Sequence, residues 1–254
     1  IKKYKQMYLI GDIGNTDIKI CLFNNNLKLV RKIRLKTILL NMNYLANNLK
    51  FINKYKSKIT KVLISSVVPL AYKNIKKFIE KSIKINCIEL KKLKLNNLLK
   101  IKVNKKQIGS DRLANAIAVI DKKRNFIVVD FGTATNFDVV IKDSYIGGIL
   151  APGVSLSLNT LSDKASLIPK IKLNKIKNVI GKNTTAAIRA GFYHGYSGLI
   201  DNIIKMIIKQ TGKSFNIILT GGYSHLFKNS IKKKTIIKNN LTINGVLKAA
   251  VLSK

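Results

Sequence analysis

The chain has 254 residues, 46% of them hydrophobic, so it is long enough and apolar enough to bury one large core or two smaller ones. Its 48 basic and 11 acidic residues give a net charge of +37 at pH 7. This hydrophobic content excludes a disordered basic tail, and no apolar run reaches the roughly 18–20 residues that a membrane-spanning helix needs.

The first part of the chain alternates strand and helix patterns, which is typical of α/β proteins. The elements that we expect here are a hairpin over 8–23, a strand at 27–35, a helix over about 43–55, a buried strand at 61–68, a helix at 70–84 and a strand at 85–90. Residues 91–108 are rich in lysine and asparagine and show little periodicity. We place the connection between two domains there, with the domains at 1–108 and 109–254.

The second part repeats this scheme. The elements that we expect are a short helix at 110–121, a second hairpin over 126–141, a strand at 145–150, a glycine-rich loop at 147–153, a helix after Ser155, a long helix near 184–210, a strand at 215–219, a glycine turn at 221–222 and a helix at 244–252. The repetition favours two similar α/β domains, each carrying one of the two hairpins.

The two hairpins share one small pattern. In the first, an apolar run ends in Asp12 and is followed by Gly14-Asn15-Thr16. In the second, an apolar run ends in Asp130 and is followed by Gly132-Thr133-Ala134-Thr135. Glycine allows a ligand close to the backbone, hydroxyls and N–H groups bind phosphate oxygens, and an aspartate organises a cation. An ordinary hairpin turn uses the same residue types, so the alternative stays open for each motif taken alone. The other common phosphate loop, GxxxxGK[ST], is absent from the sequence.

A second constellation is Gly109-Ser110-Asp111-Arg112. Ser110 can cap the helix that follows, and Asp111 can compensate the helix dipole, which is sufficient for a purely structural role. An arginine at the positive end of a helix is not explained in that way. An anionic ligand would explain it.

The order of these motifs resembles type III pantothenate kinases. The shared sequence features are Asp-x-Gly-Asn-Thr, Gly-x-Asp-Arg, Asp-x-Gly-Thr-Ala-Thr, Gly-Gly-x-x-x-Pro-Gly, Gly-Lys-Asn-Thr and Thr-Gly-Gly, running from about Leu9 to the C-terminus. The family belongs to the superfamily of acetate and sugar kinases, 70-kDa heat-shock chaperones and actin. The resemblance implies two ribonuclease-H-like domains with ATP in the cleft between them, and a homodimer.

The resemblance also implies roles for individual residues. Asp111 would be the catalytic base, and Asp130 would hold a monovalent cation, K⁺ or NH₄⁺, while Asp12 would hold Mg²⁺. Residues expected to bind ATP are Asp12, Gly14, Asn15, Thr16, Lys19, Gly132, Thr133 and Gly221. Residues expected to bind pantothenate are Gly109, Ser110, Asp111, Arg112 and Thr184. The segment 102–108 lacks the aromatic residue and the proline that family members often carry there, so we expect an altered apolar wall of the pantothenate pocket.

The expected function is therefore ATP-dependent phosphorylation of pantothenate, the first step of coenzyme A biosynthesis. The alternatives are a family relative without catalysis that acts as a regulatory or accessory protein, and a different small-molecule kinase of the same superfamily.

The basic charge suggests nucleic-acid binding as a third possibility. Only 5 of the 48 basic residues are arginine, and the lysines are spread over the whole chain. Lysine, isoleucine and asparagine share A/T-rich codons, so genome composition explains their joint enrichment. We expect no specific nucleic-acid partner, no membrane partner, and only weak, salt-sensitive binding to polyanions.

The two cysteines, Cys21 and Cys87, have no metal-ligand spacing and lie in apolar strand-like runs. They predict buried free thiols in a reducing compartment, and hence a cytoplasmic protein.

Overall fold

A computed structural model describes residues 6–253. Contacts divide the chain into two compact units: unit 1 comprises Ile1–Val119 with Leu241–Lys254, and unit 2 comprises Ile120–Asn240. Unit 1 is thus built from two separate pieces of sequence. This division differs from the boundary expected between 108 and 109, because the helices α4 (Ser110–Val119) and α8 (Leu241–Leu252) pack with the first sheet.

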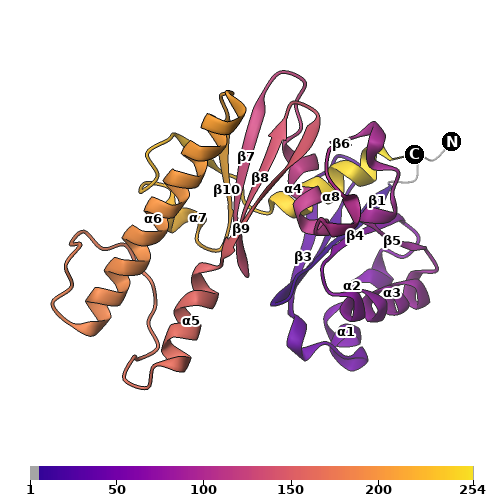
Figure 1. Cartoon of the computed structure of the whole chain (residues 1–254). Coiled ribbons are helices and arrows are strands. Elements are labelled where there is room, and N and C mark those ends of the chain that lie inside the picture. The colour runs from indigo at the N-terminus through magenta and orange to yellow at the C-terminus, as the bar shows by residue number, and fades with distance from the viewer. Residues whose placement is uncertain (1–5, 254) are drawn as a thin grey trace. The chain divides into compact units, whose positions relative to one another are not determined.

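The sheet of unit 1 has the strand order β3-β2-β1-β4-β5 (Figure 1). The hairpin strands and their neighbour are antiparallel, whereas β4 and β5 run parallel to β1. The strands are β1 (Met7–Ile13), β2 (Asp17–Phe23), β3 (Leu29–Lys36), β4 (Ile59–Ser66) and β5 (Cys87–Glu89).

One face of this sheet packs against α1 (Met42–Asn48), α2 (Phe51–Lys54) and α3 (Pro69–Ile83), with Ile13, Ile64 and Ile75 in the shared core. The sequence predicts a single helix over 43–55, and this prediction is wrong: the helix is interrupted between Asn48 and Phe51. The side-chain amide of Asn48 donates to the carbonyl oxygen of Tyr44 at 2.9 Å. Such local side-chain bonds compete with the helical pattern.

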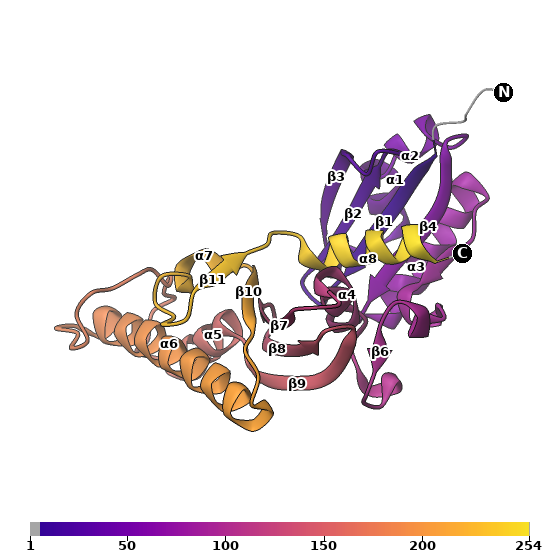
Figure 2. The same cartoon turned by 90° about the horizontal axis from the view of Figure 1, so that it is seen from above.

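The opposite face of the same sheet is covered by α4 and α8, and Figure 2 shows α8 crossing β1 and β4. The two helices approach closely, since a Cβ on Gly245 would collide with the carbonyl of Ala114. A buried hydrogen bond of 3.0 Å from the Thr242 hydroxyl to the Asn115 amide oxygen joins them. The C-terminal helix is therefore an integral part of unit 1.

The strands of unit 2 repeat the order and directions of unit 1, with β9-β8-β7 antiparallel and β10 and β11 parallel to β7. They are β7 (Asn125–Phe131), β8 (Ala134–Ile141), β9 (Ser144–Pro152), β10 (Asn216–Gly221) and β11 (Thr235–Ile237). The repeated order confirms the predicted fold class, two ribonuclease-H-like α/β units.

One face of the second sheet packs against α5 (Val154–Lys164), α6 (Thr184–Thr211) and α7 (Ser224–Phe227) (Figure 1). The loop expected at 147–153 is mostly strand, because β9 continues to Pro152 and Leu150 pairs with Asn136 of β8. The positive φ of Gly147, 129°, lies at the irregularity in this pairing.

The region of 91–108 contains short elements rather than one irregular linker. These are the 3₁₀ turns η2 (Leu90–Lys92), η3 (Leu95–Asn97) and η4 (Lys105–Gln107) and the strand β6 (Lys100–Ile101); a further 3₁₀ turn, η1 (Thr37–Leu39), follows β3. Among residues 6–253, no helix is long and apolar enough to cross a membrane.

Candidate functional site

The turn of the first hairpin is fixed by hydrogen bonds from both sides. The Gly14 N–H donates to the carbonyl oxygen of Asp17 at 3.0 Å. The Thr37 hydroxyl donates to the carbonyl of Gly14 at 2.8 Å, and the Thr37 N–H donates to that of Thr16 at 3.1 Å. Asn15 and Thr16 are exposed. The result is a well-fixed turn whose Asn15 amide and Thr16 hydroxyl are exposed.

Asp12 lies at the end of β1 with a side chain that is 14% exposed. Its register partners are Lys19 on β2 and Ser65 on β4, so the three side chains form one row on one face of the sheet. The Lys19 Nζ lies 3.6 Å from Asp12 Oδ2. The predicted pair Asp12 and Lys19 is therefore brought together, and the sequence did not single out Ser65.

The segment 109–112 begins α4, and here one detail of the prediction is wrong. Ser110 does not cap the helix: it is the first helical residue, and its buried hydroxyl donates to Glu89 Oε1 at 2.6 Å. The carbonyl of Gly109 accepts the N–H of Leu113 at 3.2 Å. Glu89 of β5 thus fixes the start of the helix that carries Asp111.

The carboxylate of Asp111 folds back over Gly109. A Cβ on residue 109 would collide with Asp111 Oδ1, so only glycine leaves this position free. Burial raises the pKa of Asp111 above its usual 3.8, although the N–H of Arg112, which donates to Oδ1 at 2.8 Å, and the Arg112 charge lower it. A carboxylate with a raised pKa is a better proton acceptor than a solvated one.

The second hairpin places Asp130 at the end of β7 and leaves Gly132 and Thr133 exposed in the turn. The Gly132 N–H donates to the carbonyl of Ala134 at 3.0 Å. A Cβ on Gly153 would lie 2.6 Å from the carbonyl carbon of Thr133. Gly153 therefore lets the start of α5 lie directly against this turn.

Gly221 comes from β10, far along the sequence, and contacts Asp130. Its φ is +88°, and a Cβ there would lie 2.7 Å from Asp130 Oδ1 and 2.5 Å from the carbonyl oxygen of Phe131. The next residue, Gly222, donates its N–H to that same carbonyl at 3.0 Å. The predicted nucleotide residues Gly132, Thr133 and Gly221 are thus gathered around Asp130 within unit 2.

Asp130 also heads a row of three side chains, with Asn136 of β8 and Thr220 of β10 as its register partners. Asn136 is 9% exposed, and its buried side-chain oxygen finds no hydrogen-bond partner within residues 6–253. A carboxylate beside an amide oxygen is an oxygen donor set of the kind that hard cations prefer. Asn136 was missed because its place beside Asp130 depends on the register of β7 and β8, which the sequence does not reveal.

Thr184 is the first residue of α6, and its side chain is exposed. The helix is capped by Asn183, whose side-chain oxygen accepts the N–H of Ala186 at 2.9 Å. In both views the N-terminal end of α6 lies away from the strands of its sheet (Figures 1 and 2). Within unit 2, Thr184 therefore stands on a different element from the residues around Asp130.

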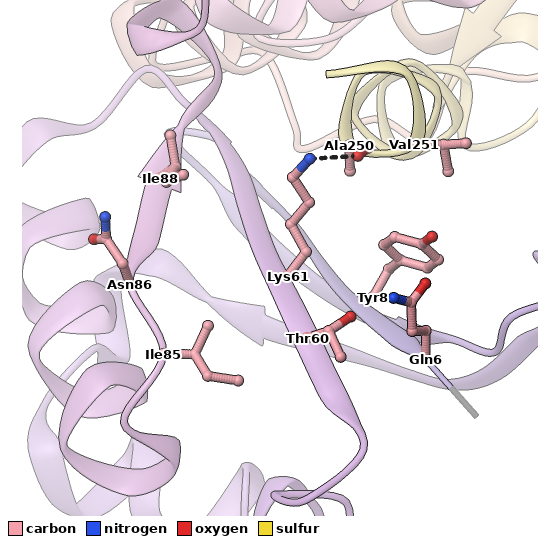
Figure 3. Close-up of a pocket in the computed structure, with 9 residues that line it drawn as sticks. All are labelled: Gln6, Tyr8, Thr60, Lys61, Ile85, Asn86, Ile88, Ala250 and Val251. Atoms are coloured by element: carbon pink, nitrogen blue, oxygen red, sulfur yellow. Dashed lines mark hydrogen bonds between the residues drawn. The ribbon is translucent and has the colours of Figure 1, made fainter. Parts of the chain in front are cut away.

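A cavity of about 470 Å³ in unit 1 involves none of the predicted residues (Figure 3). It lies beside Lys61, which donates to the carbonyl of Ala250 at 2.8 Å and to the carbonyl and hydroxyl of Ser253, the latter at 3.0 Å. Burial lowers the pKa of Lys61. Its ammonium group caps the end of α8, so we assign it a structural role.

Two ribonuclease-H-like α/β units, each with an Asp-x-Gly hairpin at the end of its first strand, define the fold class of this chain. The activator of the 2-hydroxyisocaproyl-CoA dehydratase from Clostridium difficile, solved with bound ADPNP, shares this fold: the TM-score is 0.54 at 12% identity, covering 98% of this chain and 94% of that one. A protein described as a Baf family transcriptional activator from Campylobacter jejuni gives a TM-score of 0.57 at 20% identity, covering 95% and 96%.

Sequence comparison identifies the family within this fold class. The profile of type III pantothenate kinases matches residues 8–206. A type III pantothenate kinase of Pelagibacter ubique (strain HTCC1062) is 55% identical over 248 residues, which cover 98% of this chain and all of the relative. The chain belongs to the type III pantothenate kinase family.

Proposed function

We propose that this protein transfers the γ-phosphoryl group of ATP to the primary alcohol of pantothenate, the first step of coenzyme A biosynthesis. The observation that carries the proposal is the Asp111 carboxylate, folded over Gly109 beside Arg112 with a raised pKa, in a chain of the type III pantothenate kinase family. A regulatory relative without catalysis would have no need of a half-buried carboxylate with a raised pKa.

In this mechanism Asp111 orients the alcohol and accepts its proton as the oxygen–phosphorus bond forms and the bond from the γ-phosphorus to the β,γ-bridging oxygen breaks. ADP and 4′-phosphopantothenate are the products. Phosphoryl transfer depends mostly on positioning and charge neutralisation. Arg112 neutralises charge on the pantothenate carboxylate or on the phosphoryl group, and Gly109, Ser110 and Thr184 bind pantothenate.

The two turns would hold the ATP phosphates. Residues assigned to the nucleotide are Asp12, Gly14, Asn15, Thr16 and Lys19 from unit 1 and Gly132, Thr133 and Gly221 from unit 2. Asp12 suits Mg²⁺, which is usually bound through one or two carboxylates together with substrate phosphates. Asp130 suits a monovalent cation, K⁺ or NH₄⁺, together with the Asn136 side-chain oxygen, which has no hydrogen-bond partner among the described residues. These ions would supply positive charge to the phosphates.

We also propose a homodimer in the cytoplasm, with no specific nucleic-acid or membrane partner. Exposed apolar side chains on β9, α5 and the segment that follows support an interface on unit 2; they are Leu150, Leu156, Leu167, Val179 and Ile180. Cys21 and Cys87 are buried free thiols whose pKa burial raises to about 11 and about 12, which suits a reducing compartment.

The test is ADP release by the purified protein with ATP, Mg²⁺ and K⁺, with and without pantothenate. Turnover that requires pantothenate and is lost in Asp111→Asn supports the proposal. Asp163→Asn, which removes an exposed carboxylate on α5, is the control that keeps activity. A wild-type protein that binds ATP and ignores pantothenate would instead support the regulatory relative or a kinase with another substrate.

A further inference from the structure

Two adjacent serines at the end of β4 differ in how their hydroxyls are satisfied. The Ser66 hydroxyl donates to the carbonyl of Val68 and accepts its N–H, both at 3.2 Å. Ser65 is fully buried, and its hydroxyl has no hydrogen-bond partner within the part of the chain that the structure describes. Buried polar atoms are nearly always paired, so an orphaned hydroxyl indicates a partner that is absent or a side chain that moves.

The Ser65 side chain lies on the face of the sheet that α4 and α8 cover. Side chains alternate along a strand, so Ser65 shares a face with Lys61, whose ammonium group meets α8. Ser65 is also the register partner of Asp12. Two residues further on, Val67 lies so near Gly109 that a Cβ on the glycine would be 3.6 Å from Val67 Cγ1. The end of β4 thus connects the Asp12 turn with the segment that carries Asp111.

The second unit repeats this arrangement. Thr220 of β10 is the register partner of Asp130, as Ser65 of β4 is of Asp12, and Thr220 is 4% exposed. Each half of the chain therefore sets a buried hydroxyl residue beside the aspartate that ends its first strand. Chance placement of a polar residue in an otherwise apolar strand does not explain why it occurs twice at the same position.

We propose that Ser65 is a positioning residue for Asp12, an inference that rests on the proposed ATP site. The separation of 3.6 Å between Lys19 Nζ and Asp12 Oδ2 is longer than a good hydrogen bond. With Mg²⁺-ATP bound, an Asp12 oxygen would accept a hydrogen bond from the Ser65 hydroxyl, which would orient the carboxylate that holds the metal. Carboxylates at metal sites are commonly oriented by such an outer hydrogen bond.

The experiment measures equilibrium binding of a non-hydrolysable ATP analogue by calorimetry at increasing Mg²⁺ concentrations. The variants are Ser65→Ala, the control Ser66→Ala on the opposite face, and Ser65→Thr, which keeps the hydroxyl. We expect Ser65→Ala to raise the Mg²⁺ concentration for half-maximal binding by about 10–100-fold. Binding without Mg²⁺ should stay unchanged, and both Ser66→Ala and Ser65→Thr should require Mg²⁺ as the wild type does.

Two results would overturn this inference and leave the proposed function standing. One is a wild-type Mg²⁺ requirement in Ser65→Ala, and the other is an equal loss of binding with and without Mg²⁺. The second would mark Ser65 as a structural residue, and a lowered thermal unfolding midpoint would accompany it. A wild-type protein that binds no nucleotide under any condition would overturn both this inference and the proposed function.

Discussion

The side chain of Asp111 has a fixed direction and a raised pKa, and both result from the way its carboxylate folds over Gly109. The carboxylate can fold over residue 109 because that residue is glycine, and in this position it is partly withdrawn from water. Burial disfavours the charged form of a carboxylate. The environment that would make Asp111 a useful base therefore also makes its ionised form unfavourable for folding.

We predict that Asp111→Asn strongly lowers activity without destabilising the protein at neutral pH. The folded-state pKa of Asp111 lies above its unfolded value, so its contribution to stability is present below pH 3.8 and is lost as the pH rises through the folded pKa. An uncharged amide avoids this loss. The kcat should fall by about 10²–10⁴-fold, while the thermal unfolding midpoint at pH 7 stays equal or rises.

The same residue predicts the acid side of the pH profile. In the wild type, kcat should fall as the pH drops through the raised pKa of Asp111, above 3.8, because a protonated carboxyl cannot accept the alcohol's proton. The residual activity of Asp111→Asn should lack this limb. A limb that persists in the variant would assign the base to another residue.

At the scale of elements, the turn after β10 depends on one of its two glycines. Gly221 has φ +88° and no room for a side chain beside Asp130, whereas the nearest atom to a Cβ on Gly222 is 4.0 Å away. We predict that Gly221→Ala destabilises the protein by about 1–3 kcal/mol, and that Gly222→Ala changes stability by less than about 0.5 kcal/mol. Denaturant unfolding of the pair measures the difference, and equal effects would contradict it.

The segment 102–108, where the sequence departs from the family pattern, is held by a lysine. Lys91 donates to the carbonyl of Ile108 at 2.8 Å and to that of Lys106 at 3.1 Å, directly before Gly109. We predict that Lys91→Met loosens this segment and raises the KM for pantothenate by roughly tenfold, the equivalent of one lost hydrogen bond to a charged group. The KM for ATP should stay unchanged. In the control Lys92→Met, which replaces an exposed lysine, neither the KM for pantothenate nor the KM for ATP should change. An equal rise in both KM values would point to a wider disturbance.

An element could be predicted from the sequence only where its residues form a recognisable pattern. Both hairpins were evident because an aspartate and a glycine interrupt apolar runs. Helix α7 and strand β11 were missed because each is too short to show a period. Ser65 was missed since residues 61–68 read as one apolar run, in which alternation cannot show which face a residue takes. Contacts such as Gly221 with Asp130 depend on strand register, which the sequence does not reveal.

At the scale of the whole molecule, the net charge of +37 should act on substrate capture. ATP and pantothenate are anions, and a strongly charged surface raises encounter rates in a salt-dependent way. With K⁺ held constant and choline chloride added, we predict a fall in kcat/KM for ATP of about tenfold, at the lower end of such steering effects, and little change in kcat. A kcat/KM that is insensitive to salt would show that the charge has no part in binding.

Unit 1 is assembled from residues 1–119 and 241–254, and this has a consequence for synthesis on the ribosome. Its sheet emerges early, but the apolar face with Ile10 and Leu63 needs α8, whose buried residues include Val246 and Ala249. Unit 2 is continuous in sequence and has all its elements by Asn240. The half of the molecule that is translated first therefore finishes folding only when α8, which is translated after the whole of unit 2, has left the exit tunnel.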